Sequence, residues 1–442
     1  MTTPVLDFLR SYAAADISRL HMPGHKGRGP IGCEGFDITE IAGADDLSCP
    51  SGIIAESEDN ASALFGSRRS FYSAGGSSQC VKAMLLLCAR RSASQRILAA
   101  RNVHRSFVHA CALLGLQPVW LRGETPSASL CSCRVTPAEL RRALEAMDEP
   151  PVAVYITSPD YLGAMQDVPA LAGVSHAFGV PLIVDNAHGA YLRFLPEDMH
   201  PLSLGADMCC DSAHKTLAVL TGGAYLHVSK DSVRDFEADG REALGVFGSS
   251  SPSYLITASL DAMNARLAGD YPRELRRFAE RLGALRSRLA SLGVPVEPSD
   301  PLRLTIAAFR AGYTGSELAD ALRSHGAESE LADRDYLVLM FTPDNSEADL
   351  RRVEAAFEGF VPREPLSPLP APPEAEVYIS LREALLAPRE RVSASAAAGR
   401  VLASAAFTCP PAVPIAIAGE RLTSEHVRLL LACGIDDIEV IK

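Results

Sequence analysis

The stretch from Ile183 to Leu226 reads IVDNAHGAYLRFLPEDMHPLSLGADMCCDSAHKTLAVLTGGAYL, and the interpretation of the whole chain starts from it. The apolar residues 181–184 are typical of a buried strand, and this run ends on Asp185. Further along comes Lys215, in a turn of small and polar residues that reads DSAHKT. An acid at the tip of a buried strand and a lysine in such a turn can serve one ligand site.

The pair formed by Asp185 and Lys215 suggests a site for pyridoxal phosphate (PLP). A lysine can hold the PLP aldehyde as a Schiff base, and an aspartate can keep the pyridine nitrogen protonated, so that the ring acts as an electron sink. Neutral lysine is the nucleophile, and burial lowers the lysine pKa towards that form. On these two residues alone, a purely structural role is the better interpretation. Further stretches of the sequence favour the PLP site over the structural role.

The composition is that of a globular protein, with 442 residues, 47% of them hydrophobic and 22% charged. The length is enough for two or three domains. A formal net charge of −12 argues against a general affinity for nucleic acid or anionic membranes. No apolar run approaches membrane-spanning length, and the first residues lack the basic start and apolar run of a signal peptide.

The number and spacing of the cysteines predict the cellular compartment of the protein. There are 11 of them, an odd number, and none is arranged as a CxxC pair. This pattern predicts reduced, mostly buried thiols in a cytoplasmic protein, and it predicts no metal site.

Residues 70–81 read SFYSAGGSSQCV and predict a phosphate site. A short strand runs into two glycines and then into Ser77 and Ser78, and we expect a helix over Val81–Arg90. Free N–H groups at a helix N-terminus and two hydroxyls can bind a phosphate, which glycine lets approach the backbone. Serine is also an ordinary N-cap, so the turn alone is weak evidence. It is not a P-loop.

Two further stretches carry histidines. His104 follows an expected strand, where ligands bind in α/β proteins, and an imidazole there can stack on a pyridine ring. A histidine that only caps a helix is the alternative. Residues 21–27 read HMPGHKG, a loop that suits an anion or a cofactor, with a solvated loop as the equal alternative. The acidic residues between 37 and 59 we interpret mostly as solvated surface.

Strand and helix patterns alternate up to residue 228, which predicts an α/β fold with a mostly parallel sheet covered on both faces. We expect an N-terminal segment and large domain over 1–267, a small α+β domain over 268–361, a proline-rich linker over 362–376 and a C-terminal α/β domain over 377–442. The expected strands are 97–100, 118–121, 152–157, 182–185, 208–211, 224–228, 302–309 and 336–341. The expected helices are 81–90, 137–147, 168–178, 255–267, 271–292, 315–324 and 346–357.

Together these stretches resemble the bacterial ornithine/lysine/arginine decarboxylase family of fold-type-I PLP enzymes, in its short form without a wing domain. HMPGHK at 21–26 and SAHKTL at 212–217 look like the family's N-terminal signature and its PLP-lysine motif. SPSYL at 251–255, ASLD at 258–261 and the tail from Pro410 to Glu420 also fit. The resemblance implies decarboxylation of arginine, lysine or ornithine to an amine and carbon dioxide, as in polyamine biosynthesis.

The resemblance also implies residue roles. Lys215 holds PLP, Asp185 pairs with the pyridine nitrogen, and His104 stacks on the ring. His188 lies near the cofactor O3′ or the ring face, and Lys215 or His214 returns a proton. The residues expected around the phosphate or the lysine are Gly76, Ser77, Ser78, Ser212 and His214.

A homodimer with active sites at the subunit interface follows from the same resemblance, with Ser250 or a neighbour reaching the other subunit's phosphate. The expected partner is a small amino-acid substrate, with neither nucleic acid nor membrane. By location only, Arg303 and Arg310 are candidates for binding the substrate carboxylate. Glu330 and Asp333 are candidates for binding a basic side chain, with solvated surface as the equal alternative.

Several positions depart from the family pattern. Asn186 and Tyr191 stand where the family usually has Glu and His, Gly222 where it has Gln, and Ser404 where it has a tail Glu. An Asn-Gly of the phosphate turn is Gly-Gly at 75–76, and Tyr-Pro-Pro-Gly is Cys-Pro-Pro-Ala at 409–412. A cationic substrate needs a carboxylate partner, so the identity of the substrate stays open. Another fold-type-I reaction, such as transamination, and a PLP-binding paralogue without turnover are the alternatives.

Overall fold

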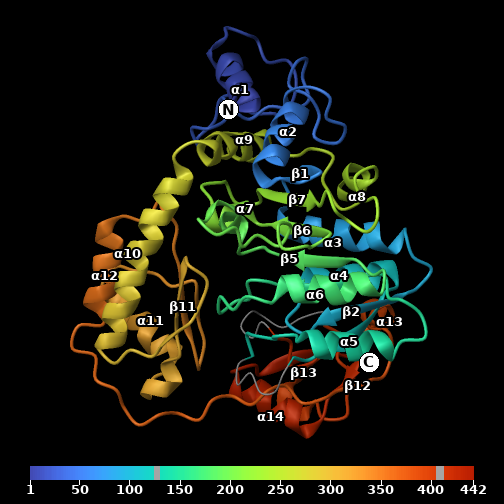
Figure 1. Cartoon of the computed structure of the whole chain (residues 1–442), viewed down its shortest axis with the longest axis vertical. Coiled ribbons are helices and arrows are strands. Elements are labelled where there is room, and N and C mark those ends of the chain that lie inside the picture. The colour runs from blue at the N-terminus through green and yellow to red at the C-terminus, as the bar shows by residue number, and fades with distance from the viewer. Residues whose placement is uncertain (124–129, 405–412) are drawn as a thin grey trace. The chain divides into compact units, whose positions relative to one another are not determined.

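The computed structural model describes residues 1–123, 130–404 and 413–442, which form two compact units (Figure 1). The first unit combines Met1–Arg91 with Val168–Leu275, and the second combines Ser92–Asp167 with Arg276–Lys442. The division into domains at 267, 361 and 376 stays a prediction.

In the first unit the strand order is β1-β7-β6-β5. The strands β5 (Leu182–Asp185) and β6 (Met208–Asp211) are parallel and fully buried, whereas β7 (Ala224–Val228) runs antiparallel to β6 and to β1 (Arg69–Ser73). Continuous apolar runs of this kind form strands that are covered on both faces. The predicted strands 182–185, 208–211 and 224–228 are confirmed.

Helices complete the first unit. Their bounds are α1 (Pro4–Ala14), α2 (Ile53–Phe65), α3 (Gly76–Ala89), α6 (Val168–Ala177), η1 (Ala190–Phe194), α7 (Ala213–Thr216), α8 (Gly240–Val246) and α9 (Tyr254–Ala268). The predicted start of α3 at Val81 is wrong, because the helix begins at Gly76. The Gln79 side-chain oxygen accepts hydrogen bonds from the Gly75 N–H at 3.1 Å and the Ser73 hydroxyl at 2.6 Å, which stabilises an earlier first turn. Ser77 and Ser78 therefore lie within the helix.

A carboxylate from a distant helix holds the N-terminal helix. Oδ2 of Asp261, on α9, accepts hydrogen bonds from the N–H groups of Val5 at 3.0 Å and Leu6 at 2.9 Å, at the start of α1. The Ser57 hydroxyl donates to the other oxygen of the same carboxylate. Asp261 thus acts as an N-cap for α1, because it accepts hydrogen bonds from free N–H groups of the first turn. These bonds also hold the N-terminal segment against α9.

In the second unit, one group of strands has the order β4-β2-β3. The strands β2 (Arg96–Ala100), β3 (Gln117–Leu121) and β4 (Val154–Thr157) are parallel where they pair, and the helices α4 (Arg105–Leu114) and α5 (Pro137–Glu145) follow β2 and β3. The prediction of a mostly parallel α/β sheet is confirmed, with antiparallel pairing confined to β1 and β7.

A separate antiparallel sheet in the second unit has the order β10-β11-β9-β8. Figure 1 shows α10, α11 and α12 beside it. The elements are α10 (Tyr271–Ser291), β8 (Val296–Glu297), β9 (Arg303–Ile306), η2 (Ala308–Ala311), α11 (Gly315–Ser324), β10 (Leu331–Ala332), β11 (Leu337–Met340) and α12 (Glu347–Ala356). The predicted strand 302–309 is too long, because the chain turns into the short helix η2 after Ile306.

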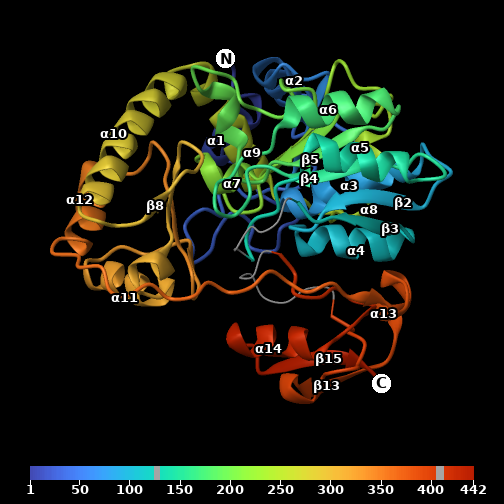
Figure 2. The same ribbon diagram turned by 60° about the horizontal axis from the view of Figure 1, so that its bottom comes forward.

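The last segment forms a small α/β group, seen in Figure 2, in which α14 lies beside β13 and β15. Its elements are β12 (Glu376–Val377), α13 (Leu381–Leu386), β13 (Arg389–Ser393), η3 (Ala394–Ala396), β14 (Glu420–Arg421), α14 (Ser424–Ala432) and β15 (Asp437–Ile441). The strands pair antiparallel, β12 with β14 and β13 with β15.

A buried ion pair links this segment to the end of β2. Two guanidinium nitrogens of Arg101 donate to the two carboxylate oxygens of Glu420, each at 2.7 Å, and both side chains are at most 5% exposed. The Arg101 guanidinium lies 4.9 Å from the ring centroid of Trp120, and the N–H of Ile417 donates to Glu420 at 2.7 Å. Bidentate geometry and these added contacts offset part of the cost of burying two charges.

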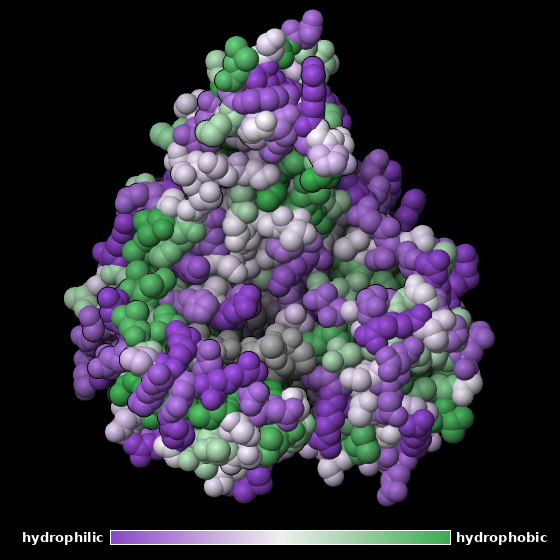
Figure 3. Space-filling view, turned by 180° about the vertical axis from the view of Figure 1, so that it is seen from behind, coloured by the Kyte–Doolittle hydropathy of each residue, from purple (hydrophilic) through white to green (hydrophobic). Residues whose placement is uncertain are grey.

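Hydrophilic and hydrophobic residues are interspersed over the face drawn in Figure 3. Within the described parts of the chain, no helix has both the length and the apolar character needed to cross a bilayer.

We predict that Glu420→Gln lowers the free energy of unfolding by about 3–5 kcal/mol, because Arg101 then keeps its buried charge without a counter-ion. The control is Glu425→Gln, which removes an exposed pair with Arg428 and should cost less than about 1 kcal/mol. Chemical denaturation followed by circular dichroism measures both. Equal losses in the two variants would contradict a special role for the buried pair.

Candidate active site

Two parallel strands end side by side at the candidate site. Asp185 closes β5 and is paired in register with Cys210 of β6, and α7, which carries Lys215, begins two residues after β6 ends. The Nζ atom of Lys215 lies 2.9 Å from Nε2 of His188, three residues after Asp185. The two segments that the sequence singled out therefore leave adjacent strand ends, as in other α/β ligand sites.

Asp185 is buried, with 3% of its surface exposed. Its Oδ1 accepts hydrogen bonds from the N–H of Ala187 at 3.1 Å and from the thiol of Cys210 at 3.7 Å. His188 is also buried, whereas Lys215 is half-buried. A buried acid and a half-buried lysine at neighbouring strand ends match the arrangement that a PLP ring requires.

The residues predicted to bind a phosphate lie at the start of α3. The Ser212 hydroxyl donates to the Ser77 hydroxyl at 2.7 Å, and Ser78 follows in the same helical turn. Gly76 has a φ of +71°, a conformation that favours glycine, and a Cβ built on it would lie 3.9 Å from Cε1 of His214. The structure thus brings together Gly76, Ser77, Ser212 and His214, beside the first N–H groups of a 14-residue helix.

His214 is held by its own strand–helix turn. Its Nδ1 lies 3.0 Å from the carbonyl oxygen of Gly223, and burial lowers its pKa, with that hydrogen bond working in the opposite direction. The imidazole is therefore predominantly neutral near pH 7.

Gly222, which departs from the family pattern, lies against the phosphate turn. The Gly76 N–H donates to the carbonyl oxygen of Gly222 at 2.8 Å. Gly222 has a φ of +98°, and a Cβ on it would lie 3.1 Å from the carbonyl oxygen of Ala74. A longer side chain at 222 would be strained, so the glycines of the turn and of position 222 suit each other.

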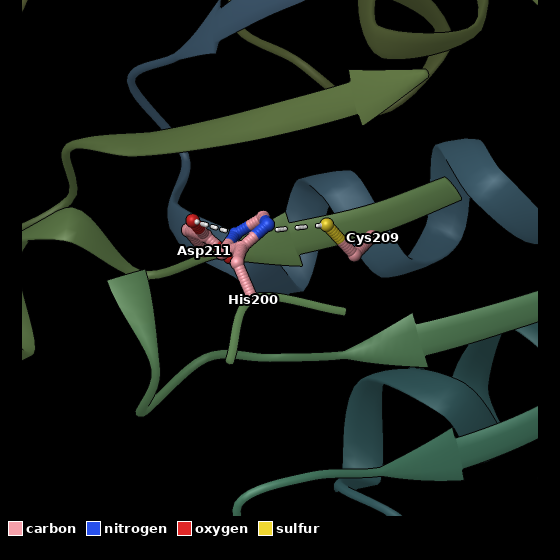
Figure 4. Close-up of side chains that lie close together, drawn as sticks. All are labelled: His200, Cys209 and Asp211. Carbon is pink, nitrogen blue, oxygen red and sulfur yellow. Dashed lines mark hydrogen bonds and ion pairs between the residues drawn. The ribbon is translucent and has the colours of Figure 1, made fainter. Parts of the chain in front are cut away.

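A buried hydrogen-bond network, part of which Figure 4 shows, surrounds Asp211 at the end of β6. Its Oδ1 accepts from Nδ2 of Asn186 at 2.7 Å, and its Oδ2 lies 3.0 Å from Nε2 of His200 and 3.3 Å from Nε2 of His227. Ligand atoms of His200, Cys209 and Asp211 lie within 4.8 Å of one another, as in some metal sites. These hydrogen bonds account for the buried carboxylate, and we assign no ion to the group.

The contacts described for this group test neither of two further predicted residues, His104 and Ser250. His104 belongs to the second unit, is exposed and caps α4, with its ring nitrogen Nδ1 accepting from the N–H of Ser106 at 3.2 Å. Ser250 is exposed in the turn before α9. The roles that the resemblance implies for both residues stay predictions.

Two of the residues considered for the substrate have other partners. Arg303 is 1% exposed, pairs with Asp300 at 3.1 Å and donates to the Tyr161 carbonyl at 2.9 Å, so its charge is already matched. The prediction that Arg303 binds the substrate carboxylate has no support here. Arg310 pairs with Glu297 at 2.7 Å on the surface.

The acidic candidates and the N-terminal loop have local contacts. Glu330 is exposed, and burial raises the pKa of Asp333. In the loop, His21 Nε2 lies 2.6 Å from the Tyr12 hydroxyl, and His25 Nε2 lies 3.2 Å from Asp37. The tail positions 409–412 lie outside the described residues.

The sequence interpretation missed two contributors to the site. Gln79, which braces the phosphate turn, was visible only as part of the SSQC string. His200 lies eleven positions before Asp211 in a loop, and nothing in the sequence indicates that it packs on β6.

Comparisons with known proteins agree with this arrangement. The family model described as Orn/Lys/Arg decarboxylase, major domain, matches residues 3–294. The uncharacterised protein YaaO of Bacillus subtilis is 33% identical over 97% of this chain and 94% of its own length. The arginine decarboxylase of Bacillus subtilis is 29% identical over 96% of this chain and 92% of its own length.

A solved structure shares the fold. The lysine decarboxylase LdcF of Francisella novicida aligns with 100% of this chain and 81% of its own, with a TM-score of 0.85 and 18% identity. The resemblance stated from the motifs, and the fold-type-I architecture that it implied, are confirmed.

The lowered pKa of His214 predicts a pH effect on stability. As the pH falls through about 6.5, the unfolded chain takes up a proton on this residue before the folded chain does, and stability is lost. We therefore expect the wild type to lose more unfolding free energy than His214→Gln between about pH 7.5 and 5.5. Urea denaturation at several pH values measures the difference. If the difference in unfolding free energy between the wild type and His214→Gln did not change with pH, the lowered pKa of His214 would be contradicted.

Proposed function

This chain belongs to the Orn/Lys/Arg decarboxylase family, and on that premise we propose that it decarboxylates arginine with PLP held at Lys215. It is a PLP-dependent amino-acid decarboxylase that acts on a basic amino acid. The observation that carries the assignment of the site is the 2.9 Å contact between Lys215 Nζ and His188 Nε2, beside the buried Asp185.

The residues around Lys215 fit PLP. Asp185, a buried acid at a strand end, suits the pyridine nitrogen, and the hydroxyls of Ser77 and Ser212, 2.7 Å apart at the start of α3, suit the phosphate. Gly76 leaves the room that a Cβ would fill. Ser78 and His214 complete the proposed cofactor-binding group, with the proposed contributions of His104 and Ser250.

When bound, PLP supplies an electron sink for the electrons left on the α-carbon as the carboxylate departs. His188 Nε2 lies close enough to accept a proton from Lys215 Nζ, which leaves the amine as the neutral nucleophile. A carboxylate at the buried position of Asp185 would favour a protonated pyridine nitrogen. Lys215 or His214 is the proposed donor that returns a proton to the α-carbon.

Arginine is proposed as the substrate because the curated Bacillus arginine decarboxylase is alike over nearly its full length, whereas the solved lysine decarboxylase shares chiefly the fold. The chain is also proposed to act as a homodimer. Apolar side chains of the N-terminal segment support this, since Leu20 is 93%, Met22 67% and Ile31 81% exposed in the single chain.

The substrate is tested by measuring carbon dioxide release from arginine, lysine and ornithine, with PLP supplied. We expect the highest kcat/KM with arginine and an amine as the organic product. A keto acid product would favour a transaminase instead. A chain that binds PLP but turns over none of the three would be a PLP-binding paralogue.

Lys215→Ala should abolish the visible absorbance of the lysine-linked cofactor, because no other amine is proposed to hold the aldehyde. Lys230→Ala, which changes an exposed lysine, is the matched control and should keep the band. Absorbance spectra of the purified proteins with added PLP measure this. The proposal fails if the wild type shows no band or if Lys215→Ala retains it.

A further inference from the structure

Two hydrogen bonds from Asn186 join the two strand ends that form the proposed site. Asn186 directly follows Asp185, and Asp211 directly precedes Ser212. The Asn186 Nδ2 group donates to Asp211 Oδ1 at 2.7 Å, and the Asn186 N–H also donates to the carbonyl oxygen of Cys210 at 3.0 Å. Asn186 is fully buried, so its amide is held by the protein and not by solvent.

The surroundings of Asp211 keep it ionised. Burial alone raises the pKa of Asp211, but His200 and His227 outweigh it and hold the pKa below its usual range. Burial lowers the pKa of His227, whose other ring nitrogen lies 2.7 Å from the Ser70 hydroxyl. Asp211 is therefore a buried anion that Asn186, His200 and His227 contact from three segments of the chain.

The orientation of Asn186 is fixed on its other side. A Cβ built on Gly189 would lie 2.0 Å from Asn186 Oδ1, and the Gly189 N–H donates to the Asn186 carbonyl at 2.8 Å. Only glycine at position 189 leaves space for the Asn186 side chain, which therefore packs closely against the turn that carries His188.

We propose that Asn186 and Asp211 are a matched amide–carboxylate pair of positioning residues. The pair sets the segment with Asp185 and His188 against the segment with Ser212 and Lys215. It explains why an amide replaces the usual acid at 186, since a carboxylate there would face Asp211. The inference rests on the proposed PLP site and adds two residues that do not themselves touch the cofactor.

Asn186→Asp tests the pair with almost no change in size. At low pH the introduced carboxyl is protonated and can donate a hydrogen bond as the amide does, whereas at higher pH two carboxylates repel each other. We expect the PLP affinity of this variant to fall at least about tenfold below that of the wild type, as for other residues that orient a binding group, and the loss to grow with pH.

Three other titratable groups near Asp211 cannot produce this pH dependence. Burial raises the pKa of the Cys80 thiol to about 12 and also raises the pKa values of Cys209 and Tyr225, so all three stay neutral over the test range. His200 and His227 also face Asp211, and they are present in every variant. Titrations with PLP at about pH 6, 7, 8 and 9, followed by the lysine-linked absorbance band, give the affinities.

The exchange variant Asn186→Asp/Asp211→Asn restores one amide and one acid with their places reversed, and it should recover most of the affinity and remove the added pH dependence. Asn264→Asp is the matched control: Asn264 is equally buried and donates to the Tyr72 hydroxyl at 2.6 Å, and not to Asp211. It should lower the melting temperature but leave the pH dependence of PLP binding as in the wild type.

Two failures are distinguishable. A wild type that forms no lysine-linked band overturns the proposed function, and this inference with it. If the wild type binds PLP, this inference alone is overturned by an Asn186→Asp variant that binds like the wild type at every pH, by an exchange variant that recovers nothing, or by an Asn264→Asp control that shows the same pH-dependent loss.

Discussion

The parallel pairing of β5 with β6 is the constraint on which the proposed chemistry depends. Parallel strands end at the same edge of a sheet, so Asp185 and the turn that carries Lys215 emerge together although the sequence separates them. The antiparallel return of β7 then brings His227 beside Asp211. The phosphate turn before α3 meets the same edge through the contact between Ser212 and Ser77. The local motifs therefore work only because this register is kept.

Much of this arrangement could be predicted because its signals are local. Apolar runs that end on polar residues located β5, β6 and β7, and the motif around Lys215 indicated the cofactor. Contacts between distant segments left no such signal. The start of α3 was placed too late because the Gln79 side chain stabilises the first turn, and propensity does not show that. Arg303 looked available for a ligand only because its partner Asp300 and its burial are tertiary facts.

Two of the departures from the family pattern, Gly222 and Asn186, have partners in the structure that suit them. Gly222 and Gly76 are hydrogen-bonded, and each has a backbone conformation that favours glycine. Asn186 stands where the family usually has an acid, and its amide donates a hydrogen bond to Asp211 at the end of the neighbouring strand. A substituted buried residue need not disable a site when the new side chain still suits its hydrogen-bond partner.

The contact between Arg101 and Glu420 has a consequence for how much of the chain can be removed. Arg101 directly follows strand β2, yet its counter-ion comes from the last part of the polypeptide. A shortened chain that ends before residue 420 would leave the buried guanidinium of Arg101 in contact with Trp120 but without a counter-ion. The C-terminal segment is therefore not a detachable appendage, and a nonsense mutation late in the gene should yield an unstable protein that cellular proteases clear.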